Sequence, residues 1–305
     1  MKIFLTGASG FVGSHLARLL VRAGHEVHAL LRPGASVERI GDILDRLAVV
    51  EGDLKRQDEW FARIDRGRPE VWVHLAWIAT PGVYLKSPEN TEYVAASLQL
   101  AKRLAETGCR RFVAAGTCFE YAPSTTALSE SAPTGPRTIY AASKLEFEVS
   151  IERLAASWGV HFVWPRLFYL YGPGEHEKRL VPVLIRSLLR NEIAKLASGD
   201  RVFDYLHVED VAAGIWAAAQ SDLRGPVNIA SGRPVTLRDL AEEVERQIGV
   251  AGLLAFDAYA SDPIDLAHVL GDNRRLLSTG WKPRYTLQEG IRQTIEWWKN
   301  RMRAN

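Results

Sequence analysis

The sequence predicts an α/β fold in which a doubly wound parallel sheet is accompanied by a smaller C-terminal lobe. Up to Arg166, short apolar runs of strand character alternate with helix-like patterns, and beyond Arg166 this rhythm ends. Alternating strands and helices form a parallel sheet with helices on both faces. With 305 residues, the chain can bury one large core or two smaller ones.

The individual elements are predicted from the spacing of apolar residues. Residues 2–5 are a short apolar run, and the apolar residues from Phe11 to Val21 follow one face of a helix. Further strands are predicted at residues 26–31, 47–51, 71–75, 111–115 and 161–166. Helices are predicted at residues 91–106, 140–158, 180–190, 237–248 and 287–301, with a short extended segment at residues 205–208.

The turn after the first strand contains Gly7, Gly10 and Gly13, spaced three apart. The first glycine allows a sharp turn, the second lets the backbone approach a pyrophosphate, and the third lets the helix pack tightly on its strand. The N–H groups at the start of the helix then face the phosphates. Because a strand precedes the turn and a helix follows it, the sequence predicts a dinucleotide site. The turn residues expected to contact this ligand also include Ser9, Phe11 and Val12.

The end of the strand and helix alternation at Arg166 divides the chain into two parts with different roles. We expect residues 1–166 and 203–230 to form a dinucleotide-binding domain of the Rossmann type. We expect residues 167–202 and 231–305 to form a substrate-binding lobe, with the chain crossing between the two parts more than once.

The end of the second strand indicates which dinucleotide binds. In such sheets this position meets the adenosine ribose, where a carboxylate selects NAD and an arginine accommodates the 2′-phosphate of NADP. About 20 residues beyond the glycines the chain has Leu31 and Arg32, and no acid. We therefore expect NADP as the preferred cofactor and NAD as the alternative. The competing interpretation of Arg32 is an ordinary solvated turn residue.

Tyr140 and Lys144 are the candidate catalytic pair. Four residues apart on a helix, the phenol and the ammonium group lie on one face and can meet. The usual pKa of tyrosine is about 10, and we expect the neighbouring cation to lower it. Thr117 follows the fifth strand, and its hydroxyl can donate a hydrogen bond to a substrate carbonyl. Alone, such a pair is ordinary on an amphipathic helix, but with the glycine turn it indicates an active site.

These motifs together resemble the extended short-chain dehydrogenase/reductases, the NAD-dependent epimerase/dehydratase group that acts on nucleotide sugars. The resemblance covers nearly the whole chain. It is carried by residues 7–13, 117–121, 140–144, 165–166, 171–174, 207–211, 228–232 and 280–283.

The resemblance implies a role for each matching residue. In this family a hydride moves between the nicotinamide and a sugar carbon; Tyr140 would be the acid/base, Lys144 would tune it and bind ribose, and Thr117 would polarise the carbonyl. Related proteins also dimerise through the helices that match residues 91–106 and 140–158. Further cofactor contacts are implied for Asp53, Leu54, Leu75, Ala76 and Arg166.

Departures from the family pattern bear on the reaction. Sugar dehydratases carry an Asp-Glu pair after the catalytic threonine, where this chain has Cys118 and Phe119. Members similar to GDP-fucose synthase use a cysteine two residues before a tyrosine, where Phe119 again stands. We therefore expect reduction of a keto group on a 4-keto-6-deoxy nucleotide sugar, because net reduction draws on NADPH. The alternatives are a nucleotide-sugar 4-epimerase and a non-catalytic cofactor-binding protein.

The substrate side of the site is less well defined. Many relatives have Asn where this chain has Tyr169, and Arg where it has Phe203, to bind a diphosphate. Arg201 can replace the missing arginine if the stretch is a strand, since it lies two residues earlier on the same face. The remaining candidates for substrate contacts are Cys118, Phe119, His176, Arg179 and Arg274.

Composition excludes several other classes of protein. The net charge of +2 gives no basis for nucleic-acid binding, and no apolar run approaches the roughly 20 residues that span a bilayer. Cys109 and Cys118 have neither metal-ligand nor disulfide spacing, which fits a reducing compartment. We therefore expect a cytoplasmic enzyme without a metal.

Overall fold

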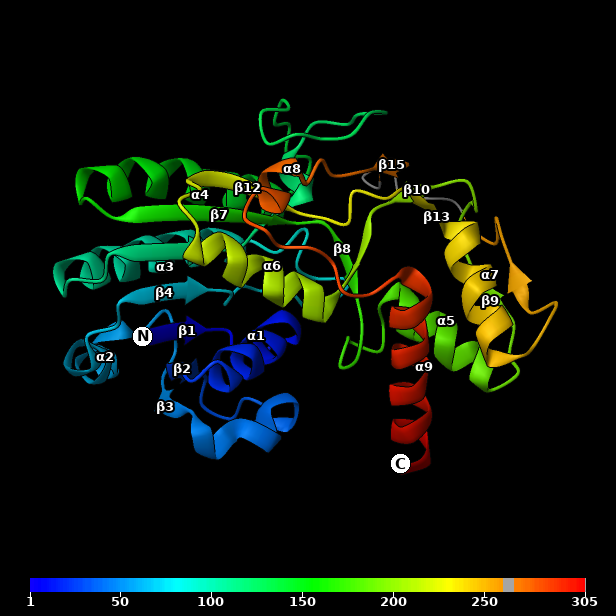
Figure 1. Ribbon diagram of the computed structural model, residues 1–305, viewed down its shortest axis with the longest axis horizontal. Helices are drawn as coiled ribbons and strands as arrows, with labels where there is room; N and C mark the ends of the chain where they lie inside the picture. The colour runs from blue at the N-terminus through cyan, green and yellow to red at the C-terminus, as the bar shows by residue number, and fades with distance from the viewer. Residues whose placement is uncertain (260–265, 305) are drawn as a thin grey trace.

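In the computed structural model, which describes residues 1–259 and 266–304, an eight-stranded parallel sheet forms the centre of the larger domain (Figure 1). The strand order is β12-β7-β5-β4-β1-β2-β3, and β6 pairs with β7. The strands are β1 (Lys2–Thr6), β2 (Glu26–Leu31), β3 (Ala48–Glu51), β4 (Val71–His74), β5 (Arg111–Ala114), β6 (Gly116–Thr117), β7 (His161–Leu167) and β12 (Gly225–Ile229).

The six predicted strands of this sheet are confirmed to within one residue at each end. The sequence did not predict β12, whose run starts with Gly225 and Pro226 and includes Asn228, all poor strand formers. It pairs in parallel with β7, with Asn228 beside Arg166. The sheet therefore gains an edge strand from late in the chain.

Helices cover both faces of the sheet because successive residues of each strand point to opposite sides. Ile3 packs in one core with Ile215, whereas Phe4 packs in a second core with Leu100. The first core lies under α1 (Phe11–Arg22) and α6 (Val208–Gln220), and the second under α3 (Glu89–Glu106) and α4 (Ile139–Ser157). Shorter helices follow the strands: 3₁₀ helices η1 (Glu38–Arg46), η2 (Gln57–Glu59) and η3 (Cys118–Glu120), and helix α2 (Phe61–Gly67).

The C-terminal lobe has a separate core beside the carboxyl ends of the strands (Figure 1). Leu184, Leu240 and Ile291 contribute to this core from three different helices. Its helices are α5 (Leu180–Leu189), α7 (Leu237–Ile248) and α9 (Leu287–Ala304). The short helix α8 (Arg274–Leu277) instead lies beside β12, and its Leu276 packs in the first core of the larger domain (Figure 1). Its short strands are β8 (Tyr169–Tyr171), β9 (Ala194–Lys195), β10 (Val202–Phe203), β11 (Tyr205–His207), β13 (Val235–Thr236), β14 (Leu254–Ala255) and β15 (His268–Val269).

The strand order reverses at β1, which lies between β2 and β4. In open parallel sheets, ligands bind outside the carboxyl ends of the strands at such a reversal. The turn after β1, the ends of β4 and β5, and the lobe meet at this edge. No helix among the described residues is both long and apolar enough to cross a membrane.

Gly13 fixes how closely α1 approaches the turn after β1. A Cβ atom at Gly13 would lie 2.0 Å from the carbonyl oxygen of Gly7, so any larger residue forces α1 away. We expect Gly13→Ala to lower the free energy of unfolding by about 3 kcal/mol, measured by urea denaturation. Gly41→Ala in η1 is the control, because no atom lies within 4 Å of its added Cβ. Equal effects of the two substitutions would contradict the steric argument.

Candidate active site

The glycine turn has the geometry that a diphosphate requires. Gly7 has a φ of 85°, in the left-handed region, and a Cβ there would lie 2.7 Å from the backbone nitrogen of Ala76. The turn therefore packs directly against the end of β4. Gly10 caps α1 without a side-chain hydrogen bond, so no capping side chain competes for the N–H groups of the first turn. This end of α1 fits the diphosphate of a dinucleotide.

Charged residues gather at the ends of β2 and β3, where the adenosine is expected. Arg32 is exposed, and Asp53 accepts a hydrogen bond from the backbone of Lys55 at 2.8 Å. The ammonium of Lys55 lies 5.3 Å from the ring centroid of Tyr93 in α3. Burial raises the pKa of Tyr93, and the positive charges of Arg32 and Lys55 oppose this shift. Lys55 was not predicted from the sequence as a residue of this site, although its position two residues after Asp53 could have indicated it.

Lys144 is buried at the carboxyl edge of the sheet. Its Nζ donates a hydrogen bond to the carbonyl oxygen of Ala115 at 2.8 Å and lies 3.8 Å from the ring centroid of Trp77. Burial lowers the pKa of Lys144 to about 7, and the charge of Glu120 acts in the opposite direction. Trp77 was not singled out from the sequence, but it directly follows Leu75 and Ala76, which were.

Tyr140 begins the first turn of α4, and Thr138 caps this helix by accepting a hydrogen bond from the backbone N–H of Ala141 at 3.1 Å. The Tyr140 ring packs edge-on against Tyr84, with 4.9 Å between centroids. Burial raises the pKa of Tyr140, with smaller contributions from Tyr84 and Glu120, while the Thr117 hydroxyl lowers it. The expected lowering is thus wrong in direction: burial dominates, and the Lys144 ammonium is directed at Ala115 and Trp77.

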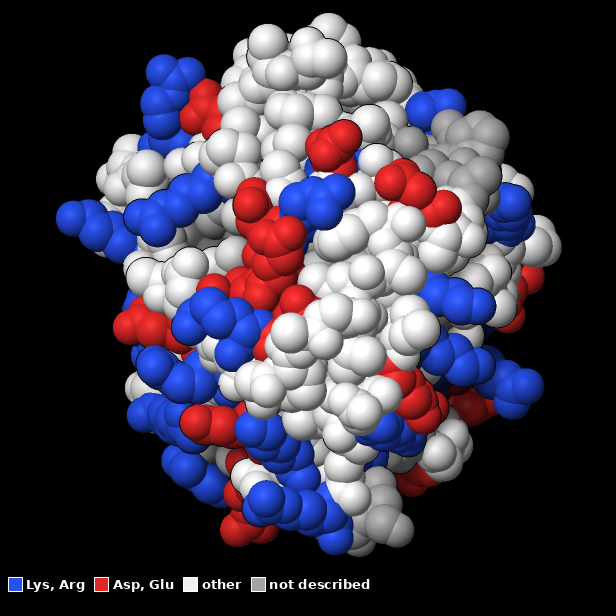
Figure 2. Space-filling view, turned by 90° about the vertical axis from the view of Figure 1, so that its right-hand side faces the viewer, with Lys and Arg blue, Asp and Glu red and all other residues white. Residues whose placement is uncertain are grey.

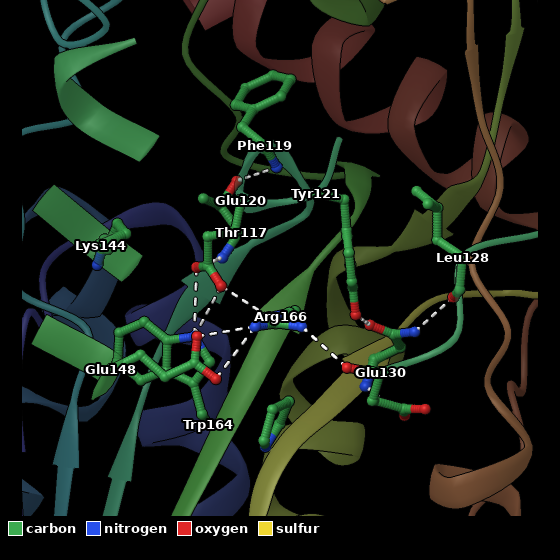
Figure 3. Close-up of polar contacts among 12 residues, drawn as sticks. Thr117, Phe119, Glu120, Tyr121, Leu128, Glu130, Lys144, Glu148, Trp164 and Arg166 are labelled. Carbon is green, nitrogen blue, oxygen red and sulfur yellow. Dashed lines mark hydrogen bonds and ion pairs between the residues drawn. The ribbon is translucent and has the colours of Figure 1, made fainter. Parts of the chain in front are cut away.

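Thr117 ends β6 and caps η3 (Figure 3). Its hydroxyl oxygen accepts a hydrogen bond from the backbone N–H of Phe119 at 3.3 Å, and its own N–H donates to Glu120 Oε1 at 2.7 Å. Because the oxygen is engaged as an acceptor, the hydroxyl hydrogen is left to donate. Thr117 and Tyr140 are close enough for the threonine hydroxyl to lower the tyrosine pKa.

A buried ionic network lies behind Thr117 (Figure 3). Arg166 Nε donates to Glu120 Oε2 at 2.7 Å, and Arg166 Nη2 donates to Glu148 Oε2 at 2.8 Å. Trp164 Nε1 also donates to Glu120 Oε2, at 3.0 Å. Burial raises the pKa of Glu148 to about 8. Arg166, expected at the cofactor, thus lies among buried carboxylates, while Glu120 and Glu148 were not predicted because their partner is distant in sequence.

Aromatic side chains form the part of the site next to Thr117. Phe119 packs against Tyr169, with 6.1 Å between ring centroids, and Tyr169 contacts Phe203 in a tilted arrangement, with 4.4 Å between centroids. The guanidinium of Arg201 lies 5.2 Å from the Phe203 ring centroid. Cys118 is buried, and burial raises its thiol pKa. The structure therefore brings these predicted substrate residues together.

The loop after β8 brings charged groups toward Tyr140. Arg179 donates a hydrogen bond to the Tyr84 hydroxyl at 3.4 Å, and Tyr84 in turn contacts Tyr140. Glu175 has a buried Oε2 without a hydrogen-bond partner in the described structure, and burial raises its pKa to about 8. His176 lies in the same loop, near Arg179.

Arg39 anchors this loop to the larger domain by donating from Nε to the Gly174 carbonyl at 2.8 Å. Arg274, a further predicted substrate contact, is instead exposed in α8, and its guanidinium pairs with Asp272 at 2.5 Å. The loop is therefore close to the Tyr140 side of the site, whereas Arg274 projects toward solvent.

Comparison with known proteins agrees with this geometry. A model of the NAD dependent epimerase/dehydratase family matches residues 3–230. The chain belongs to this family. It is an NAD-dependent enzyme of the epimerases, dehydratases and reductases that act on nucleotide sugars, as the resemblance implied.

Several members align over most of their length. GDP-L-fucose synthase 1 of Arabidopsis thaliana is 26% identical over 318 residues, which cover 97% of this chain and 93% of that protein. The dTDP-6-deoxy-L-talose 4-dehydrogenase (NAD(+)) of Aggregatibacter actinomycetemcomitans is 25% identical over 249 residues, covering 80% and 89%. The UDP-glucose 4-epimerase of Thermus thermophilus, solved with NAD, has 28% identity and a TM-score of 0.87, covering 98% and 99%. The Rossmann-type fold is thus confirmed.

The raised pKa of Glu175 predicts a pH-dependent cost to stability. Between about pH 4.5 and pH 8 the folded protein holds a proton on Glu175 that the unfolded chain releases, so this residue lowers stability as pH rises. Glu175→Gln is neutral throughout. We expect its free energy of unfolding, relative to the unmodified protein, to increase from pH 5 to pH 8 and then level off, as measured by denaturant titration.

Glu177→Gln is the matched control, because this neighbouring carboxylate is exposed and pairs with Arg186. Relative to the unmodified protein, the free energy of unfolding of Glu177→Gln should show no comparable rise over this pH range. If the free energy of unfolding of Glu175→Gln differs from that of the unmodified protein by the same amount from pH 5 to pH 8, Glu175 ionises normally.

Proposed function

We propose that this enzyme uses NADP to reduce a keto group of a nucleotide-activated 4-keto-6-deoxy sugar. The observation that carries the proposal is the convergence of Thr117, Tyr140 and Lys144, with a tyrosine that burial keeps protonated. Reduction of a ketone requires a proton for the new hydroxyl oxygen, and a protonated phenol is suited to donate it.

Each of the three side chains has a distinct part in the proposed reaction. The bound nicotinamide supplies the hydride. Thr117 donates a hydrogen bond to the carbonyl oxygen, and Tyr140 transfers its phenolic proton to that oxygen as negative charge develops there. Lys144 would bind the ribose of the cofactor, one helical turn from Tyr140.

The neighbouring residues favour redox chemistry over elimination of water. Cys118 and Phe119 occupy the positions of the dehydratase acid pair, and the next carboxylate, Glu120, is held by Arg166 and Trp164. The name of the relative dTDP-6-deoxy-L-talose 4-dehydrogenase supports redox chemistry at carbon 4. A nucleotide-sugar 4-epimerase is the second candidate, favoured by the similarity to the Thermus enzyme.

The proposed sugar site lies between the catalytic residues and the lobe. Residues 1–166 and 203–230 would bind the dinucleotide, and residues 167–202 and 231–305 the nucleotide sugar. Arg179 is supported as a contact by its hydrogen bond to Tyr84, which packs on Tyr140. The contacting rings of Tyr169 and Phe203 would contribute an apolar surface where many relatives have polar diphosphate ligands.

We further propose a cytoplasmic homodimer that binds no nucleic acid. Val149 and Leu154 of α4 are exposed apolar residues, at 49% and 37%, on one of the two helices expected to pair; static light scattering tests the dimer directly. Both cysteines are buried and unpaired, as suits a reducing compartment. Figure 2 shows acidic and basic side chains interspersed over the lobe's face rather than a continuous basic surface.

The preference for NADP is tested at Arg32. Arg32 and Lys55 place two cations at the adenosine end, so we expect NADP to bind more tightly than NAD in fluorescence titrations. Arg32→Glu should weaken NADP binding about 10- to 100-fold, since charge-assisted hydrogen bonds contribute roughly 1.5–3 kcal/mol. Arg56→Glu, at an exposed arginine that pairs with Glu59, is the control. Tighter binding of NAD by the unmodified protein would remove the NADP preference.

The reaction is tested by incubating the protein with NADPH and a panel of nucleotide 4-keto-6-deoxy sugars, with cofactor oxidation followed by absorbance. Consumption of one cofactor per sugar converted would establish a reductase, whereas conversion without consumption would establish an epimerase. We expect Tyr140→Phe to lower turnover at least about 100-fold and to leave cofactor affinity unchanged. Turnover that survives this substitution would refute the mechanism. Cofactor binding with no turnover of any sugar would favour a non-catalytic protein.

A further inference from the structure

We propose that Glu120 is a positioning residue that holds the Thr117 hydroxyl toward the substrate carbonyl. This inference rests on the proposed function, because it assigns Glu120 an effect through Thr117. Glu120 itself does not contact the substrate in this proposal. It is the last residue of η3 and is fully buried, with 0% exposure.

Two hydrogen bonds hold Thr117 at the start of η3, and one of them is accepted by Glu120. The N–H of Thr117 donates to Glu120 Oε1 at 2.7 Å, and the Thr117 hydroxyl oxygen caps the same turn by accepting from Phe119. These bonds fix both the backbone of Thr117 and the acceptor side of its hydroxyl. The hydroxyl hydrogen can then point in only a few directions. Such restriction is needed if the hydroxyl is to donate to a substrate carbonyl oxygen.

The other oxygen of Glu120 is tied to the central sheet. Oε2 accepts hydrogen bonds from Arg166 Nε at 2.7 Å and Trp164 Nε1 at 3.0 Å, and both donors belong to β7 (Figure 3). Arg166 pairs in register with Gly116, the residue before Thr117. The carboxylate thus connects the threonine to an interior strand of the sheet. A site built on strands holds its groups more precisely than one built on a loop.

The chain leaves room for this carboxylate at Gly116. A Cβ at Gly116 would lie 2.6 Å from Glu120 Oε1 and 2.2 Å from Trp164 Nε1. A buried carboxylate is costly unless it is fully hydrogen-bonded, and here two side chains and one backbone N–H surround it.

Glu148 provides a matched control for a purely structural role. It is the second buried carboxylate on Arg166, with Nη2 to Oε2 at 2.8 Å, but no hydrogen bond joins it to Thr117 in the described structure. Glu120→Gln and Glu148→Gln each replace one carboxyl group of the same network with an amide. If Glu120 only stabilises the fold, the two substitutions will affect catalysis alike.

The first measurement needs no substrate. We expect Glu120→Gln to accelerate hydrogen–deuterium exchange of the amides of residues 117–121 in the full-length protein, and Glu148→Gln to leave their exchange unchanged. Unchanged protection in Glu120→Gln overturns the inference whatever the turnover. If Glu120→Gln does not fold, Glu120→Asp keeps the charge, withdraws the carboxylate from Thr117, and takes its place in each comparison.

The second measurement uses the sugar that the unmodified protein reduces with NADPH. We expect Glu120→Gln to lower kcat about 10- to 100-fold, with KM and cofactor Kd changed less than about threefold, because misplacement by about 1 Å has effects of this size. In a Thr117→Ala background, Glu120→Gln should have no further effect on kcat. Equal kcat in Glu120→Gln and Glu148→Gln, or additive effects with Thr117→Ala, would overturn the inference. Failure of every sugar would overturn the proposed function and leave hydrogen exchange to decide the inference.

Discussion

The contact between the turn after β1 and the start of α1 determines where the rest of the site lies. Gly13 lets α1 begin against the carbonyl of Gly7, and Gly7 lets the turn rest against the backbone of Ala76 at the end of β4. The backbones at the ends of β1 and β4 and at the start of α1 are therefore in direct contact. Every group that binds or reacts at this edge is placed relative to that contact, since β4 and β5 follow β1 in the sheet.

Burial is the second constraint, and it controls the electrostatics of the candidate catalytic residues Tyr140 and Lys144. Lys144 is 4% exposed. Its ammonium contacts the Trp77 ring and the carbonyl of Ala115, so few neighbouring groups stabilise its positive charge. Burial lowers the pKa of Lys144 to about 7 and raises the pKa of Tyr140. Burial therefore favours the neutral form of each group, so Tyr140 keeps its proton until charge develops on a neighbouring group.

The fold could be predicted from the sequence more completely than the site. Strand and helix periodicity located six strands of the sheet because each strand is a local apolar run, whereas β12 contains Gly225 and Pro226 and depends on β7 for its pairing. Within the site, the glycine turn and the Tyr140–Lys144 spacing could be predicted because both are patterns of residues close together in the sequence. Glu120 could not be assigned, because its partner Arg166 is 46 residues away. The direction of the Tyr140 pKa depends on burial, which helix spacing does not reveal.

Gly116, Glu120 and Trp164 form a set whose members cannot be exchanged one at a time. The carboxylate and the indole fill the volume that a side chain at residue 116 would need, and the carboxylate in turn depends on the indole and on Arg166 for its hydrogen bonds. Members of the family without an acid at this place are free to carry a larger residue at 116 and a different one at 164. Correlated variation at these three positions would therefore mark the branch of the family that shares this support for the residue at position 117.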